Sequence, residues 1–249
     1  MNRPEISTIM TTYQDDAIEL RNAVNSILHQ EGVNIELILV MVTDDINIKA
    51  VRLWVPIINK AAKFTRMKLI EVSPEDHPGR SPGGSFYQIN EGLKHVTKPW
   101  VRWFSGDDLL YPRSSMKQVE ALEKSGKLVS YGGFTLLDEK NTVLESVKFY
   151  PYRRETHQFT NFINDVALWS SDLLKFTPFL WERWENYSFW DLWLRIYDVH
   201  GDVFHYTDEV LWSYRIRERS EHVARLKRPG GKSDYDRQRR AFKTNHPIR

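Results

Sequence analysis

The feature that most constrains the fold is an almost unbroken apolar segment, VNIELILVMV at residues 33–42, which lies between two helical patterns. A strand with this composition is covered on both faces, as in parallel sheets whose crossover helices lie on either side. Residues 15–32 carry apolar side chains at helical spacing, and residues 6–13 have the β-branched pattern of a strand. This order of strand, helix and buried strand indicates a βαβ unit.

The alternation continues along the first half of the chain. We expect a helix at 48–63, a strand at 67–72, a loop rich in proline and glycine at 73–85, a helix at 86–96 and a strand at 99–104. The second half is less regular: we expect a hairpin within 127–150, an amphipathic helix at 188–201 and a closing strand at 209–217. The chain is therefore predicted to form an α/β fold with a mostly parallel central sheet and flanking helices.

Composition excludes several kinds of site. None of the 249 residues is a cysteine, so disulfides, thiolate metal sites and cysteine nucleophiles are excluded. No signal-peptide pattern and no apolar segment long enough to span a bilayer is present, so we expect a soluble, cytoplasmic protein with no transmembrane segment.

Charge is distributed unevenly. The net charge is +2, but residues 215–249 contain twelve Lys or Arg and four Asp or Glu, a balance of +8. A basic tail of this kind suits nucleic acid, an anionic lipid surface or solvent alone, and the sequence leaves these alternatives open.

Polar side chains follow three of the expected strands. They are Thr11, Thr12 and Tyr13, then Asp44 and Asp45, then Asp107 and Asp108. The carboxyl ends of parallel strands meet at one edge of a sheet, where ligands bind in folds of this class. Carboxylates and an aromatic ring suit a divalent cation and a nucleotide, although aspartate pairs also mark turns and helix caps.

Several segments in this order resemble family 2 glycosyltransferases with the GT-A fold. ISTIMTTY resembles the strand that opens that family, and the helix after it ends in the same Ser-x-x-x-Gln pattern, here from Ser26 to Gln30. IELILVMVTDD resembles the family's second strand. The segment 85–112 resembles the Asn-x-Gly helix and the strand that carries the metal-binding DxD motif. Residues 188–220 resemble the segment with the catalytic aspartate and the closing Tyr-Arg motif. The resemblance covers about residues 5–220.

The resemblance implies a Rossmann-like nucleotide-binding half at 1–110, an acceptor-binding and catalytic half of the same domain at 111–220, and a basic tail at 221–249. The implied activity is transfer of a hexosyl or pentosyl group, with inversion, from a nucleotide-sugar donor to a carbohydrate or other hydroxyl acceptor. The implied metal is Mn²⁺ or Mg²⁺, which would offset charge on the departing diphosphate.

The resemblance also implies roles for individual residues. Asp191 would be the general base, and Asp107 with Asp108 would bind the metal. The donor nucleotide would be held by a larger set: Thr11, Tyr13, Asp44, Asp45, Asn90, Asp107 and Arg217.

Asp191 also has structural explanations. Ser188 and Asp191 have the spacing of a capping box, and Asp191 with Arg195 has the spacing of an ion pair within a helix. We expect the apolar face of this helix to pack on the core and the Asp191 face to point elsewhere.

Three residues depart from the family pattern. Ser105 stands where the DxD motif usually has an aspartate, Trp190 replaces an acidic residue, and Arg217 replaces the closing histidine, for which His222 is a second candidate. An arginine at position 217 can pair with a diphosphate directly, without a metal.

Two alternatives to the leading function stay open. One is a glycosyltransferase that acts on a modified base of nucleic acid through the basic tail. The other is a catalytically silent module of the same fold that binds a sugar or a partner. The tryptophans of the second half fit either a core or a sugar-stacking surface: Trp169, Trp181, Trp184, Trp190, Trp193 and Trp212.

Overall fold

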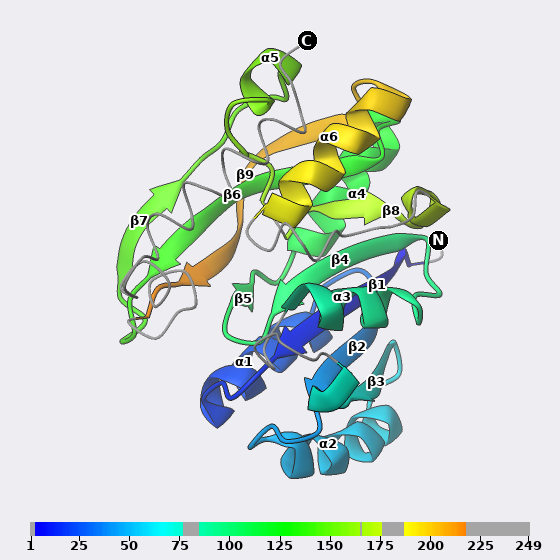
Figure 1. Ribbon diagram of the computed structural model, residues 1–249, viewed down its shortest axis with the longest axis vertical. Helices are drawn as coiled ribbons and strands as arrows, with labels where there is room; N and C mark the ends of the chain where they lie inside the picture. Colours follow the sequence, from blue (N-terminus) through cyan, green and yellow to red (C-terminus); the bar gives the residue numbers. More distant parts are fainter. Residues whose placement is uncertain (1–2, 77–84, 165, 176–186, 218–249) are drawn as a thin grey trace.

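The computed structural model describes residues 3–76, 85–164, 166–175 and 187–217 (Figure 1). Most of the loop expected at 73–85 lies outside the described residues. The same holds for Trp181, Trp184, His222 and the basic tail, which lie wholly outside them. Among the described residues, no helix is both long and apolar enough to cross a bilayer.

The first half alternates strands and helices as the sequence predicts. Its elements are β1 (Glu5–Thr12), α1 (Ala17–Leu28), β2 (Asn34–Val42), α2 (Ile48–Ala61), β3 (Thr65–Val72), the short 3₁₀ helix η1 (Pro74–Asp76), α3 (Ser85–Leu93) and β4 (Trp100–Ser105). Asp16 caps α1, because its side chain accepts hydrogen bonds from the backbone N–H groups of Ile18 and Glu19.

The second half has shorter elements and a final long strand. They are β5 (Leu109–Leu110), α4 (Ser114–Ser125), β6 (Val129–Leu137), β7 (Val143–Val147), α5 (Arg154–His157), β8 (Leu168–Ser170), the 3₁₀ helix η2 (Ser171–Lys175), α6 (Ser188–His200) and β9 (Phe204–Arg215). The expected hairpin is the antiparallel pair of β6 and β7.

One sheet of nine strands runs through both halves. Its order is β3-β2-β1-β4-β8-β6-β9-β5, with β7 paired to β6. The pairs β3–β2, β2–β1, β1–β4 and β6–β9 are parallel, whereas β8, β5 and β7 pair antiparallel with their neighbours. The predicted α/β class, with a mostly parallel sheet and flanking helices, is confirmed.

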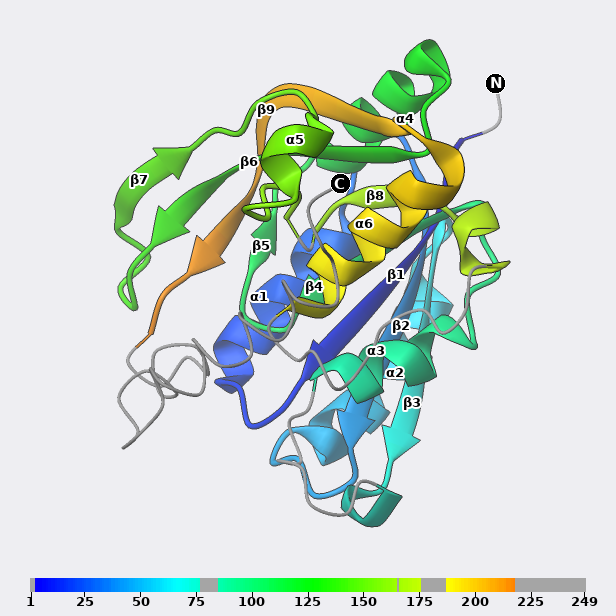
Figure 2. The ribbon, with the colours of Figure 1, turned by 45° about the horizontal axis from the view of Figure 1, so that its top comes forward.

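Two apolar cores cover the two faces of the sheet. Alternate residues of β2 enter different cores, with Leu37 and Leu39 in one and Ile38 and Val40 in the other. The first core includes side chains of α1, α2 and α4, and the second includes side chains of α3 and α6. Figure 2 shows how these helices are arranged around the sheet. The apolar segment 33–42 is therefore buried because helices cover both sides of it.

Helix α3 lies unusually close to the sheet at Gly92. A Cβ atom added there would lie 2.5 Å from Ile9 Cγ2 and 3.0 Å from Val40 Cγ2. The glycine of the Asn-x-Gly pattern thus has a packing role, since any side chain would push α3 away from β1 and β2.

Helix α4 is absent from the sequence-based expectations. The buried side of this helix is largely polar, with Ser114, Ser115 and Gln118 beside only two buried aliphatic residues, Val119 and Leu122. The side-chain amide of Gln118 donates a hydrogen bond to the carbonyl oxygen of Ser130 and accepts one from the buried Arg102. A helix held by buried polar contacts has a weak apolar stripe, so hydrophobic periodicity does not reveal it.

Candidate donor-binding site at the strand ends

Asp107 and Asp108 lie in a tight turn beyond the end of β4. The turn is held by Gly106, whose N–H donates to the carbonyl oxygen of Thr11 at 3.0 Å. A Cβ atom on Gly106 would lie 2.8 Å from Thr12 Cβ and 3.0 Å from the Asp15 carboxylate. Only glycine fits here, so the two aspartates are placed beside the loop that follows β1.

The Asp107 carboxylate is bound by two side chains. Ser105 Oγ donates to Oδ1 and Arg217 Nη2 donates to Oδ2, each at 2.5 Å. The Arg217 side chain, only 5% exposed, also lies 3.0 Å from Glu19 and 3.5 Å from Asp15. A guanidinium group therefore lies among three carboxylates at the end of the parallel sheet.

Asp108 points into the protein. Its Oδ1 accepts a hydrogen bond from the backbone N–H of Arg215 at 3.0 Å, and the residue is buried. Burial, reinforced by the neighbouring Asp107, raises the pKa of Asp108 well above its usual range. Arg215 in turn donates through Nε to the carbonyl oxygen of Asp107 at 3.1 Å and through Nη1 to Asn141 at 2.5 Å. Asp108 thus joins the turn to the last strand.

Asp15 is the third carboxylate of this group. Its Oδ2 accepts from the hydroxyl of Thr12 at 2.8 Å. Burial raises the pKa of Asp15 to about 6, the Asp107 charge adds to the rise, and Thr12 and Arg217 oppose it. A carboxyl group with a pKa this close to neutrality is typical of a functional site in which like charges are held together.

The motif from Ser26 to Gln30 fixes the segment that follows the aspartates. Ser26 Oγ accepts from Leu110 N–H at 3.1 Å, and Gln30 Nε2 donates to the carbonyl oxygen of Tyr111 at 2.8 Å. The other side of the Gln30 amide accepts from Ser115 N–H at 3.0 Å. The end of α1 therefore holds the chain from β5 to the start of α4 in position.

Tyr13, Asp44 and Asp45 lie together beyond β1 and β2. Burial and the charges of Asp44 and Asp45 raise the pKa of Tyr13. Asp44 is exposed, whereas the buried Asp45 accepts from the N–H groups of Gln14 and Asn47, both at 2.7 Å. The half-buried Tyr13 ring and the Asp44 carboxylate can contact a ligand, and Asp45 holds the two loops together.

Thr11 and Asn90 complete the expected donor set. Thr11 is buried, and its hydroxyl accepts from the indole N–H of Trp103 at 3.0 Å. Asn90 is half-buried on α3. Its neighbour Gln88 donates to the carbonyl oxygens of Thr12 and Val40, which ties α3 to the ends of β1 and β2.

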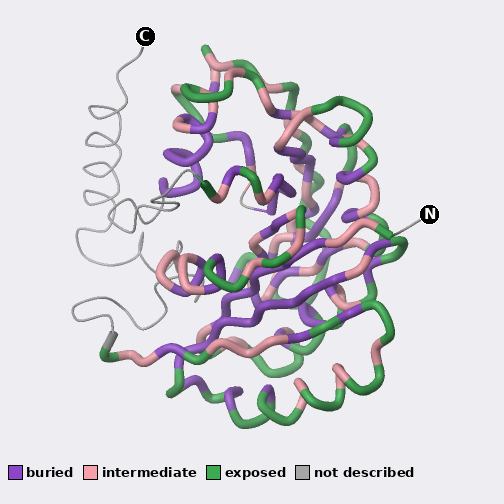
Figure 3. Tube along the Cα trace, turned by 90° about the vertical axis from the view of Figure 1, so that its right-hand side faces the viewer, coloured by how far each residue is buried: buried purple, intermediate pink, exposed green. Residues whose placement is uncertain are grey.

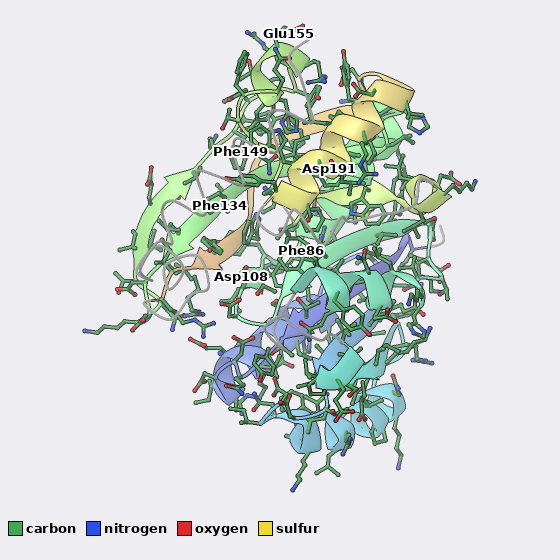
Figure 4. The ribbon with its side chains drawn as sticks, viewed as in Figure 1. Phe86, Asp108, Phe134, Phe149, Glu155 and Asp191 are labelled. Atoms are coloured by element: carbon green, nitrogen blue, oxygen red, sulfur yellow. The ribbon has the colours of Figure 1, made fainter. Side chains whose placement is uncertain are left out.

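Asp191 lies in the first turn of α6 and is 2% exposed (Figure 4). The expectation that its face points away from the core is therefore wrong. Arg195 Nε donates to Oδ2 at 2.6 Å, which confirms the ion pair within the helix. The N-cap residue of α6 is Tyr187, so Ser188 is not at the N-cap position that the expected capping box would require.

Phe189 ties the start of α6 to the site. Its ring stacks on Trp103 with centroids 5.5 Å apart, and it packs at 6.1 Å against Phe86 of α3. The indole N–H of Trp103 in turn donates its hydrogen bond to Thr11 of β1, so Phe189 is linked to that strand. The core interpretation holds for four tryptophans, which are buried: Trp169, Trp190, Trp193 and Trp212.

The described residues do not present a preformed ligand set for a metal ion. Both oxygens of Asp107 accept from protein donors, and Asp108 is directed at the backbone of Arg215. Within the described ranges, no group of three or more histidine, aspartate or glutamate side chains is placed to hold a cation. Arg217 supplies the positive charge at this point.

Sequence reasoning missed several residues of the site. Asp15, Glu19 and Arg215 join Asp107 and Arg217 through contacts between α1, the end of β9 and the segments that follow β1, β4 and β9. The repeated arginine in the closing YRIR segment was the available signal for Arg215. No local signal marks Glu19, which lies on the exposed side of an amphipathic helix pattern.

Comparisons with known proteins agree with this architecture. No protein-family model matches the chain. An uncharacterized glycosyltransferase of Rickettsia conorii is 29% identical over 145 residues, which are 57% of this chain and 22% of the relative. An uncharacterized glycosyltransferase of Rickettsia prowazekii is 26% identical over 226 residues, which are 86% of this chain and 64% of the relative. The chain thus spans about a fifth of the length of the R. conorii relative.

Solved structures show the same fold at low sequence identity. S. aureus TarS (residues 1–349) in complex with UDP-GlcNAc matches with a TM-score of 0.62 and 14% identity, over 88% of this chain and 60% of that one. The Pyrobaculum calidifontis mannosyltransferase in complex with GDP-Man and Mn²⁺ matches with a TM-score of 0.61 and 16% identity, over 90% and 61%. The chain therefore shares its fold with proteins solved with nucleotide sugars.

Proposed function

We propose that this chain is a glycosyltransferase that moves a sugar from a nucleotide-sugar donor to an acceptor hydroxyl with inversion. The observation that carries the proposal is the shared fold, over 88–90% of the chain, with structures that hold UDP-GlcNAc and GDP-Man. The names of the Rickettsia relatives support it. The cluster at the ends of β1, β2 and β4 lies where ligands bind in open α/β sheets.

The nucleoside binds at the loops after β1 and β2. Tyr13 offers a half-buried ring on which a base stacks, and the exposed Asp44 accepts a hydrogen bond from an N–H group of the base. Thr11 and Asp45 act as positioning residues, since their polar atoms bind Trp103 and the two loops. Asn90, half-buried on α3, is a further residue of the proposed donor site.

Arg217 binds the diphosphate. A guanidinium group can donate two parallel hydrogen bonds to phosphate oxygens, and it carries charge at the place where negative charge grows as the leaving group departs. Asp107, Asp15 and Glu19 hold this side chain in position before the donor binds. A divalent cation bound by Asp107 would have to displace Arg217 from its Oδ2.

Asp191 is the proposed general base. It takes the proton from the acceptor hydroxyl while that oxygen forms a bond to the anomeric carbon, and the bond from this carbon to the diphosphate oxygen breaks. The nucleoside diphosphate leaves with the electron pair of that bond. Arg195 orients the carboxylate through the 2.6 Å ion pair.

The acceptor side has a half-buried aromatic cluster. Phe134 of β6 packs against Phe149, which follows β7, with ring centroids 5.9 Å apart (Figure 4). It also packs against Tyr214 of β9 at 6.1 Å. Aromatic faces of this kind stack on sugar rings, so we assign the cluster to a carbohydrate acceptor.

A thermal-shift panel of nucleotide sugars, with and without Mn²⁺, tests the proposal. A donor at about 100 times its Kd should add about 2.7 kcal/mol to the free energy of unfolding and raise the Tm by several degrees. Tyr13→Ala should abolish most of this rise, whereas the exposed Ile18→Ala is the matched control. If no nucleotide sugar raises the Tm in either condition, the proposal is wrong.

A further inference from the structure

The outward side of α2 carries only apolar and cationic side chains. Figure 3 shows the lower end of the molecule, where α2 lies in Figure 1, as largely exposed. The exposed residues from 48 to 64 contain no acidic and no neutral polar side chain; they are Lys49, Ala50, Arg52, Leu53, Pro56, Ile57, Lys60, Ala61, Lys63 and Phe64. A helix on a protein surface normally presents polar side chains to water, so this surface is unusual.

Leu53 and Ile57 lie one turn apart on α2, Ile46 and Phe64 flank the helix, and all four side chains are exposed. Ile46 is 71% exposed, Leu53 68%, Ile57 64% and Phe64 42%. The opposite side of the helix packs on the sheet through the buried Ile48 and Val51 and their neighbours. Helix α2 therefore carries exposed apolar side chains on its outer side as well as buried ones on its inner side, and among the described residues only the inner side is packed in the core.

Residues 46–70 contain six Lys or Arg and no Asp or Glu. The charged residues within this segment are all basic, and Glu71 and Asp44 lie just beyond its ends. Lys49, Lys60 and Lys63 form no ion pair with any described residue, whereas Arg52 pairs with Glu71. Lys63 Nζ lies 5.1 Å from the Phe64 ring, and the Arg3 guanidinium group lies 4.1 Å from it.

We propose that α2 is an interfacial helix that docks this protein on an anionic lipid bilayer. Exposed aliphatic side chains flanked by lysines match such a surface, because the apolar groups enter the boundary between headgroups and acyl chains while the ammonium groups reach the lipid phosphates. Each basic residue near an anionic membrane adds to the attraction, and an acidic residue would oppose it. No acidic residue is present on this helix.

The side-chain chemistry favours lipid over a macromolecular partner. Protein interfaces carry about one hydrogen bond per 100–200 Å², and the exposed residues of α2 offer no amide or hydroxyl side chain for such bonds. Nucleic acid would leave Leu53 and Ile57 facing phosphates. An anionic bilayer interacts favourably with both the aliphatic and the cationic side chains of this surface.

The docking helix is connected directly to the candidate site. Asn47, the N-cap residue of α2, donates from its side chain to the carbonyl oxygen of Asp15 at 2.9 Å, and its N–H donates to Asp45. A bilayer bound by α2 would therefore hold the loops of Tyr13 and Asp44 at a fixed place relative to the membrane.

Vesicle flotation of the full chain tests the proposal. We expect binding to vesicles of equal parts phosphatidylcholine and phosphatidylglycerol, and little binding to pure phosphatidylcholine. Leu53→Gln with Ile57→Gln should lower the partition coefficient by about tenfold or more, since binding scales with buried apolar area. Lys49→Gln with Lys60→Gln should lower it on the anionic vesicles. Leu144→Gln with Val199→Gln, exposed elsewhere, is the matched control.

Three results would overturn the proposal. One is failure of the unaltered chain to bind the anionic vesicles. Another is unchanged binding by both α2 variants, which would assign binding to a different surface such as the basic residues 218–249. The third is a shift from dimer to monomer on Leu53→Gln with Ile57→Gln in sedimentation without lipid, which would show that a second copy covers this surface.

Discussion

Four carboxylates and two arginines share one largely buried corner at the ends of β1, β4 and β9. They are Asp15, Glu19, Asp107, Asp108, Arg215 and Arg217. The corner is costly to fold because carboxylates are buried there and like charges lie close together, and both causes raise the pKa values of Asp15 and Asp108. A protein keeps a destabilising cluster of buried charges where the binding of a ligand requires those charges.

The free energy that the buried charge of Asp15 costs can be measured through the pH dependence of stability. Its pKa is 3.8 when unperturbed and about 6 in the folded chain, so the unfolded chain loses the proton first as the pH rises. The contribution of Asp15 to stability therefore falls between pH 3.8 and 6 and stays low above that range. Asp15→Asn should raise the free energy of unfolding at pH 7 by about 2–3 kcal/mol, and by little at pH 4.

Urea unfolding at several pH values checks this prediction. Asp16→Asn is the matched control, because asparagine caps a helix as well as aspartate does and Asp16 is exposed. An equal effect of Asp15→Asn at both pH values would show that packing, and not charge, causes it.

At the scale of elements, the end of α1 positions the site through Gln30. Its side-chain amide contacts carbonyl oxygens of Ser26 and Tyr111 and the N–H of Ser115. Gln30→Ala would leave the buried Ser115 N–H without this acceptor, so it should lower the free energy of unfolding by about 2–3 kcal/mol. Urea midpoints measure the loss, and Glu31→Ala, exposed beside Gln30 in the sequence, should change stability by less than about 0.5 kcal/mol. Equal effects of the two variants would contradict the account.

The elements themselves were predictable where apolar residues follow a clear period. The strands and helices of the first half have such patterns, and so does α6. The short strands β5 and β8 do not, since two or three residues carry no period. Strand β9 begins at Phe204, earlier than expected, because its first residues pair with β6 and their own sequence is mixed.

At the scale of the whole molecule, the sequence predicted which strand ends carry polar residues but not which way each side chain turns. Thr11 binds Trp103, 92 residues away, and Asp108 binds Arg215, 107 residues away. Contacts of this kind depend on tertiary packing that a local pattern does not contain. Glu19 and Arg215 joined the site for the same reason.

The most direct test is release of nucleoside diphosphate from a nucleotide sugar that binds in the thermal-shift panel, with water standing in for the acceptor. We expect release by the unaltered chain and a loss of about 100-fold or more in Asp191→Asn, with donor affinity unchanged. Asp198→Asn, exposed on the same helix, should release at the unaltered rate. Release by Asp191→Asn at the full rate would contradict the assignment of the base, and no release with any bound donor would contradict the proposed activity itself.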